Sequence, residues 1–305
     1  MGIAKNEVPQ PQIQAVDIDG DGDHGPICDG DKEHREGVPI LPPELEQRIF
    51  TLAFHNDGGM KEMQDCCDLL LVAKKTFEWV APLVYKIVII HSTIHWPPMG
   101  LWPDKLQRYG KYVRHLLLED GREANAKHYL THCTNITNLA LINLPRLAES
   151  HPLSLVAALP LKELSIDIRF LPESSQPISS FASITHLDLA YFSEWDELPV
   201  NILSQFPSLT HLMMLGDDNC TNEDVNCIIE QVPELEVFIL VSYIRPCRIL
   251  QNELVDDLND LRVVGLRCTF VPHWKAAAQG LENPWSFAEE VIAKRRKNEL
   301  DGAMT

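Results

Sequence analysis

Most of the chain after residue 112 follows one recurring pattern of apolar and polar positions. The pattern is apolar-x-x-apolar-x-apolar, and it occurs seven times at intervals of 23 to 26 residues. Its last two apolar positions alternate with polar ones, which is typical of a half-buried strand. A nearly constant interval predicts a stack of similar units. The middle apolar residues of the seven copies are Leu116, Leu139, Leu164, Leu187, Leu212, Phe238 and Val264.

Segments between these strands are predicted to be helical, for example Glu123–Cys133, Glu223–Gln231 and Arg248–Leu258. A single strand and helix cannot bury their own apolar sides, whereas stacked units form a continuous core. We therefore expect an α/β solenoid of about seven strand–helix units with a parallel sheet over residues 111–270. The interval and the L-x-x-L-x-L core resemble leucine-rich repeats, although the Asn of that repeat is mostly absent.

Alternate strand residues point to opposite faces of a sheet, so the residues between the repeated ones are expected to form a concave outer face. Its first half is mixed and acidic, and its second half is apolar. An exposed apolar patch usually binds a partner or lies under another segment. Either the tail, residues 271–305, with Trp274, Trp285, Phe287 and a predicted helix Pro284–Lys297, or a bound partner is expected to occupy this patch. Alternatively, the repeats curve little and the patch is ordinary packing. The candidate partner-binding residues are His186, Asp188, His211, Met213, Leu215, Ile239, Val241 and Val263.

The chain before the repeats predicts a small all-α head over residues 38–91. A proline and two acidic residues near Leu41 suit a helix start, and Leu45, Ile49 and Leu52 recur at helical spacing. Two more helices, a short strand and a linker rich in Pro and Trp are expected to follow. Their ranges are 60–73, 74–82, 86–90 and 92–110.

Three motifs of this head resemble an F-box. The opening motif is Leu41-Pro42-Pro43-Glu44-Leu45 followed by Ile49-Phe50. The second is Leu69-Leu70-Leu71-Val72-Ala73-Lys74, in which Ala73 replaces the usual Ser, and the third comprises Trp79, Pro82, Leu83 and Tyr85. Together with the repeats and the ending Trp285-Ser286-Phe287-Ala288-Glu289-Glu290 with Arg295-Arg296, they resemble the F-box-like proteins numerous in mushroom-forming fungi.

The resemblance implies a non-enzymatic substrate-recognition adaptor. The head would dock on a Skp-type subunit of a cullin ubiquitin ligase, and the repeats would bind a protein substrate. One alternative is a free-standing repeat scaffold without ligase association, in which the head's apolar residues pack only on its own core. The stretch His55–Asp65 departs from compact F-boxes. The implied adaptor-binding residues are Leu41, Pro42, Leu45, Ile49 and Val72.

Charge and composition exclude several other classes of protein. The formal net charge of −18 argues against nucleic-acid binding, which needs a surplus of Lys and Arg. Residues 1–37 contain nine acidic residues, three basic ones and few large apolar ones, so we expect a disordered acidic tail. Apolar runs are too short to span a membrane. Eight cysteines without a C-x-x-C pair and no secretory segment suggest a cytoplasmic or nuclear protein.

One pair of residues could carry chemistry. His186 and His211 occupy equivalent positions of neighbouring units, with Asp188 and Asp167 nearby. Two imidazoles and a carboxylate can bind a metal or transfer protons, so a hydrolase is a remote alternative. Repetition alone also explains the pair, and hydrolase and phosphate-binding motifs are absent from the sequence. We therefore expect no catalytic residue, metal or cofactor.

Overall fold

The structure is a computed structural model that places most of the chain after residue 40. It describes residues 41–55, 70–91, 95–97, 103–119, 123–142, 151–171, 179–189, 200–215, 222–242 and 260–303. Residues 1–42 and 43–305 form two separate units. The expected acidic tail 1–37, most of the second head helix and the expected helix Arg248–Leu258 lie outside the described residues.

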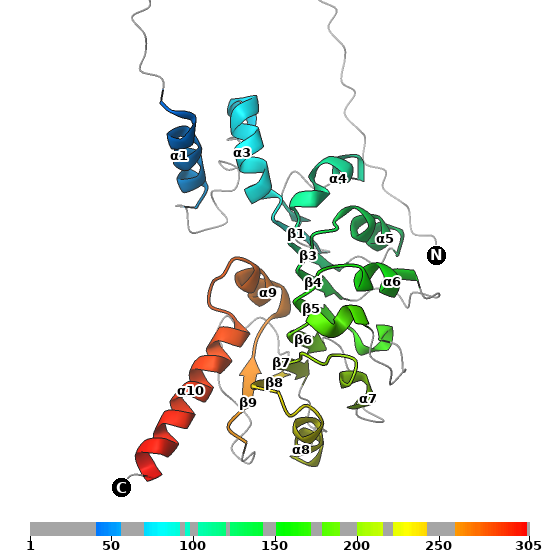
Figure 1. The fold of residues 1–305 in the computed structure, drawn as a ribbon, viewed down its shortest axis with the longest axis vertical. Coiled ribbons are helices and arrows are strands. Elements are labelled where there is room, and N and C mark those ends of the chain that lie inside the picture. The colour runs from blue at the N-terminus through cyan, green and yellow to red at the C-terminus, as the bar shows by residue number, and fades with distance from the viewer. Residues whose placement is uncertain are drawn as a thin grey trace, which may run out of the picture. The chain divides into compact units, whose positions relative to one another are not determined.

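The second unit is an α/β structure built on an open nine-stranded sheet (Figure 1). Within the described ranges the strand order is β2-β1-β3-β4-β5-β6-β7-β8-β9, and only the β1–β2 pair is antiparallel. The seven strands predicted from the repeat are therefore confirmed as β3 to β9. The strands are β1 Ile87–Ile90, β2 His95–Trp96, β3 His115–Leu118, β4 Asn138–Leu141, β5 Glu163–Ile166, β6 His186–Leu189, β7 His211–Leu215, β8 Val237–Ser242 and β9 Val263–Arg267.

Helices cover both faces of the sheet. Helices α4 to α8 contribute to the core on one face, and α9 and α10 lie against the other (Figure 1). Short 3-10 helices at Gly110–Tyr112, Ile168–Phe170 and Ser179–Ser183 complete the connections. The α-helices are α1 Pro43–His55, α3 Lys74–Val84, α4 Pro103–Tyr109, α5 Glu123–His132, α6 His151–Ala157, α7 Val200–Leu203, α8 Asn222–Gln231, α9 Phe270–Ala278 and α10 Pro284–Ala303.

The boundary between the expected head and the repeats differs from the sequence interpretation. Strand β1, expected at the end of the head, pairs with β3 and belongs to the sheet. The stretch expected to be a linker contains β2 and α4. Pairing satisfies the backbone groups of these strands, and Ile89 of β1 is fully buried.

The face under α4 to α8, here called the helix face, contains the main core. The repeated residues Leu116, Leu139, Leu164, Leu187 and Leu212 are each at most 1 % exposed and belong to one continuous cluster. Between the units, Phe181 and Phe206 stack with ring centroids 5.1 Å apart. Burial of this apolar surface is the main source of stability, about 25 cal/mol per Å² removed from water.

A recurring threonine ties each unit to the one before it. The residue directly before several strands is Thr, and its hydroxyl donates a hydrogen bond to the backbone carbonyl at the equivalent position of the preceding unit. Each of these carbonyls also accepts two backbone N–H groups of the next unit, so the threonine bond adds to the backbone pairing where the chain enters a strand. The three bonds run from Thr137 to Arg114, from Thr185 to Lys162 and from Thr210 to Thr185, at 3.2, 3.3 and 3.3 Å.

The predicted orientation of the last strand is wrong. The pattern placed Val264 opposite Phe238 in the main core and Val263 on the outer face. In the structure Phe238 pairs with Val263, and Ile239 pairs with Val264. Val263 therefore packs in the main core, while Val264 and Leu266 face α10. A register change of one residue moves every side chain of a strand to the opposite face.

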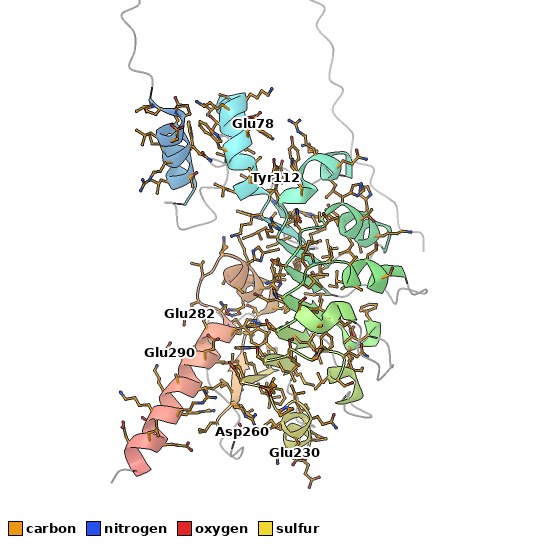
Figure 2. All side chains as sticks on the ribbon, in the orientation of Figure 1. Glu78, Tyr112, Glu230, Asp260, Glu282 and Glu290 are labelled. Carbon is orange, nitrogen blue, oxygen red and sulfur yellow. The ribbon has the colours of Figure 1, made fainter. Side chains whose placement is uncertain are left out.

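Side chains fill the space between the sheet and the helices, and acidic residues such as Glu78, Glu230 and Glu290 lie on exposed helix surfaces (Figure 2). Of the helices in the described ranges, none combines the length and the apolar character needed to cross a bilayer.

The core assignment predicts a large effect of truncating one repeated leucine. Leu212→Ala is expected to lower the free energy of unfolding by about 2–5 kcal/mol, because Leu212 is fully buried and its removal leaves a cavity. Leu281→Ala is the matched control, since Leu281 is 58 % exposed and its loss should change the value by less than about 0.5 kcal/mol. Urea unfolding measures both, and similar effects would contradict the assignment.

Candidate interaction surfaces

The outer face of the sheet, here called the tail face, is covered by the chain's own C-terminal helices. Helix α9 places Trp274 and Ala278 against Ile89, Leu117 and Ala140 of the first strands. Lys275 of α9 also lies over the Trp96 ring of β2, with Nζ 4.0 Å from the centroid. These contacts cover the beginning of the face.

Helix α10 covers the other half. Ala288 and Ile292 are buried against Met213, Ile239 and Val241, and Val264 and Leu266 of β9 complete the same cluster. The apolar patch expected from the sequence is therefore real and lies under residues 284–292. Of the two occupants expected for it, the chain's own tail is the one observed.

Specific polar contacts fix the start of α10. Asn283 precedes Pro284, which suits the first position of a helix because proline has no N–H to leave unpaired. The Asn283 side-chain carbonyl accepts hydrogen bonds from the backbone N–H groups of Trp285 at 3.0 Å and Ser286 at 3.3 Å. In return, the Ser286 hydroxyl oxygen accepts the backbone N–H of Asn283 at 3.1 Å. This reciprocal cap satisfies donors that a helix start otherwise leaves unpaired.

Further along α10, an arginine bonds the helix to the last strand. Arg295 Nη1 donates a hydrogen bond to the Val263 carbonyl at 2.6 Å. The cap at Asn283 and this bond at Arg295 therefore hold the helix at two places twelve residues apart in sequence.

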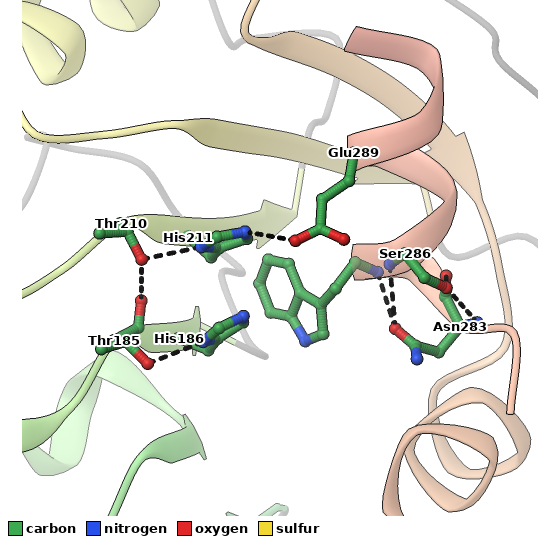
Figure 3. A network of polar contacts seen from close by, with 8 residues as sticks. Thr185, His186, Thr210, His211, Asn283, Ser286 and Glu289 are labelled. Atoms are coloured by element: carbon green, nitrogen blue, oxygen red, sulfur yellow. Dashed lines mark hydrogen bonds and ion pairs between the residues drawn. The ribbon is translucent and has the colours of Figure 1, made fainter. Parts of the chain in front are cut away.

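His186 and His211 lie together beneath α10, as the sequence indicated. Their rings stack with centroids 4.1 Å apart, and the Trp285 ring meets both edge-on at 5.3 and 5.9 Å. Figure 3 shows Thr185 and Thr210 beside the two imidazoles, and Glu289 of α10 contacting His211 at 3.2 Å. The pair therefore anchors the tail.

The surroundings of His186 lower its pKa. Its Nδ1 lies 2.9 Å from the Thr185 hydroxyl, which is 3.3 Å from the Lys162 carbonyl oxygen. Burial first, and then the neighbouring His211, lower the pKa of His186 to about 4. His186 is thus neutral at physiological pH.

A small cavity of about 30 Å³, partly open to solvent, lies between the tail helices and the middle strands. Its lining includes Asp188, whose two carboxyl oxygens are buried and have no hydrogen-bond partner within 3.5 Å among the described residues. Burial raises the pKa of Asp188 to about 7, and the nearby Ser165 hydroxyl opposes this shift only in part. Burying carboxyl oxygens without hydrogen-bond partners lowers the stability of a fold. The contacts of the described residues therefore do not explain why a carboxyl group is buried at position 188.

Most of the residues predicted for the outer face lie on the tail face, and one does not. His186, Asp188, His211, Met213, Ile239 and Val241 share the tail face, and Leu215 pairs in register with Val241. Val263 does not, because of the register of β9. Sequence reasoning did not select His273, Cys268 and Glu163, which also line the cavity. Glu163 occupies the position of His186 one unit earlier, so the repeat register contained the signal for that residue.

The head carries a separate apolar surface. Helix α1 contacts α3 through a Glu46–Lys75 ion pair and through Phe50, whose ring centroid lies 6.3 Å from that of Trp79. Leu45 and Ile49 on a different side of α1 are 47 % and 50 % exposed. These two residues, with Leu52, Leu71 and Val72, are here called the head patch. The other three are 51 %, 76 % and 62 % exposed, and residues 70–72 are helical.

Two other residues implied by the F-box resemblance, Leu41 and Pro42, belong to the first unit and are also exposed. Most of the stretch His55–Asp65, which departs from compact F-boxes, lies outside the described residues.

Neither the protein-family models nor the curated protein sequences include a match to this chain. Function is therefore inferred from the chain's own residues. Among the residues that the structure describes, no three His, Cys, Asp or Glu side chains are arranged to hold a metal ion.

The cap of α10 predicts a position-dependent effect of one substitution. Asn283→Ala is expected to lower the free energy of unfolding by about 1 kcal/mol, because two backbone donors lose their acceptor. The matched control is Asn298→Ala in the exposed interior of the same helix, which should be neutral or slightly stabilising, since Ala favours helix. Chemical denaturation compares them, and equal effects would contradict the capping role.

The raised pKa of Asp188 predicts a pH-dependent cost. An acid with a raised folded-state pKa holds its proton more tightly when folded, so its contribution to the free energy of unfolding falls as pH rises from about 4 to about 7. Asp188→Asn should therefore exceed the parent in stability at about pH 7.5, on the order of 1–4 kcal/mol.

Near pH 4 this difference should be small, because Asp188 is then protonated in the folded chain and only about half ionised in the unfolded chain. Denaturant titrations at the two pH values compare variant and parent directly, so the titration of His186 cancels. If the difference in the free energy of unfolding between variant and parent does not change with pH, the raised pKa of Asp188 is wrong.

Proposed function

We propose that the protein is a non-enzymatic substrate-recognition adaptor of a cullin ubiquitin ligase, acting in the cytoplasm or nucleus. Helix α1 and residues 70–72 form an F-box-like head that docks on a Skp-type subunit. The nine-stranded α/β unit is a leucine-rich-repeat-like solenoid that binds a protein substrate. Leu41, Pro42, Leu45, Ile49 and Val72 are the proposed docking residues.

The observation that carries this proposal is the head patch on an ordered helix. Helix α1 is already attached to α3 through Glu46 and Phe50, so Leu45 and Ile49 are not needed for that contact. Half-exposed apolar residues at positions i and i+4 of a helix are the anchors by which helices enter apolar grooves of partners. Their spacing also matches the motif that resembles an F-box.

The repeats support the second half of the proposal. Similar units stacked in register present an extended surface, which is how repeat proteins bind other proteins. The tail helices occupy the apolar part of the tail face, so a substrate that reached Met213, Ile239 or Val241 would have to displace α10.

A binding experiment tests the docking surface. We expect the purified full-length chain to retain a purified Skp-type adaptor in a pull-down, and a Leu45→Asp, Ile49→Asp double variant to lose at least roughly tenfold in affinity, about 1.4 kcal/mol. The matched control is Gln47→Asp with Arg48→Gln, which makes the same change in net charge at exposed positions of the same helix.

Thermal melting by circular dichroism verifies that each variant is folded, as expected for exposed positions. Failure of a folded parent to bind would overturn the adaptor proposal and leave a free-standing repeat scaffold. Equal binding by the double variant would place any docking elsewhere than the head patch.

A further inference from the structure

The cavity beside Asp188 has an excess of hydrogen-bond acceptors. Among the described residues, neither carboxyl oxygen of Asp188 has a hydrogen-bond partner within 3.5 Å, although the side chain is buried. His186 and Glu163 also line the cavity. Glu163 accepts one bond, from Asn138 Nδ2 at 2.6 Å. Acceptors without donors are satisfied by a ligand group that brings several N–H bonds.

The charges around the cavity point to a positive ligand. Its lining, among the described residues, includes no Lys or Arg. Burial lowers the pKa values of His186 and His273, so both imidazoles are neutral near pH 7. Burial and the Asp188 charge raise the pKa of the Cys268 thiol to about 12. The carboxyl groups are therefore the ionisable groups of the lining that can carry charge at neutral pH, and that charge is negative.

The walls of the cavity suit an ammonium group. Phe270 and Trp274 of α9 and Trp285 of α10 border it, and aromatic rings attract cations through their π faces. The volume of about 30 Å³ corresponds to two or three water molecules. An ammonium head with its first carbon fits this space, whereas a guanidinium group is larger.

We propose that this cavity is a binding site for the ammonium group of an alkylamine, with Asp188 as its counter-ion and the tail helices as its wall. The opening to solvent admits either a free amine or a lysine side chain of a bound protein, since both present the same head group. The site is distinct from the head patch, and its binding does not depend on whether the head docks on an adaptor.

The site has a predictable pH dependence. Asp188 is faced by Ser165 and Glu163 from β5, by His186 on its own strand, by Cys268 after β9 and by His273 from α9. None of these supplies a positive charge at neutral pH. A bound ammonium group favours the ionised carboxylate, so binding releases a proton when Asp188 begins protonated. Affinity should rise with pH through about 7 and fall roughly tenfold for each unit below it.

The experiment uses the full chain and n-butylammonium chloride at constant ionic strength, with sodium chloride and n-butanol as reference solutes. Tryptophan fluorescence and the midpoint of thermal melting both follow binding, because Trp274 and Trp285 border the site. We expect a saturable change with butylammonium that neither reference produces, and that is at least roughly tenfold weaker at about pH 5.5 than at about pH 8.

Three variants separate the site from general charge effects. Asp188→Asn keeps the shape and removes the counter-ion, so binding should fall at least roughly tenfold. Ala277→Met fills the cavity from α9, leaves Asp188 in place and should also abolish binding. Glu290→Gln removes one negative charge on the exposed side of α10 and should bind as the parent does.

A second ligand distinguishes a free amine from a protein lysine as the natural occupant. A lysine blocked at its amino and carboxyl groups that binds more tightly than butylammonium indicates a protein lysine, and equal or weaker binding indicates a free amine. No difference between butylammonium and sodium chloride would overturn the proposal and leave a water-filled cavity. Equal binding by the parent and both cavity variants would overturn it as well.

Discussion

The register between neighbouring strands is the constraint on which the rest of the structure depends. Because Leu116, Leu139, Leu164, Leu187 and Leu212 pair side by side, one row of aliphatic residues fills the helix face without interruption. The same register decides what reaches the other face. His186 stacks on His211, and Asp188 lies beside Ser165, as a direct consequence of how the leucines between them are paired. The polar arrangement of the tail face is thus set by the core behind it.

The tail face combines two kinds of packing under one covering segment. Toward β8 and β9 the contact is apolar, with Ile292 against Ile239 and its neighbours. Toward β6 it is aromatic and polar, with Trp285 on the two imidazoles and the cavity at Asp188. The apolar half supplies the free energy that holds α10 down, and this allows the other half to keep a carboxyl group whose burial is unfavourable. Local features that lower the stability of the fold are common at ligand-binding sites.

The parts of the fold that the sequence predicted are those in which a residue type repeats. Seven strands and the His186–His211 pair followed from the period, since equivalent positions of parallel strands paired in register are neighbours. The orientation of β9 did not, because Val263 and Val264 are both apolar and either satisfies the pattern. Strand β2 has only two residues, which is too short for any periodicity. The cavity at Asp188 depends on α9 and α10, which are far from it in sequence, and no local pattern encodes that contact.

An open sheet has two edges, and each edge is a template on which another chain can add a strand. At one end β2 stops after Trp96, and Pro97 has no backbone N–H to offer a neighbouring strand. At the other end, Arg295 donates a hydrogen bond to the backbone carbonyl of Val263, and α10 covers Val264 and Leu266 of the outermost strand, β9. The C-terminal helix therefore binds one backbone acceptor of β9 and covers one face of that strand. We expect that proteolytic cleavage between α9 and α10, followed by loss of α10, exposes the edge of β9 to strands of other chains and favours fibrous assembly.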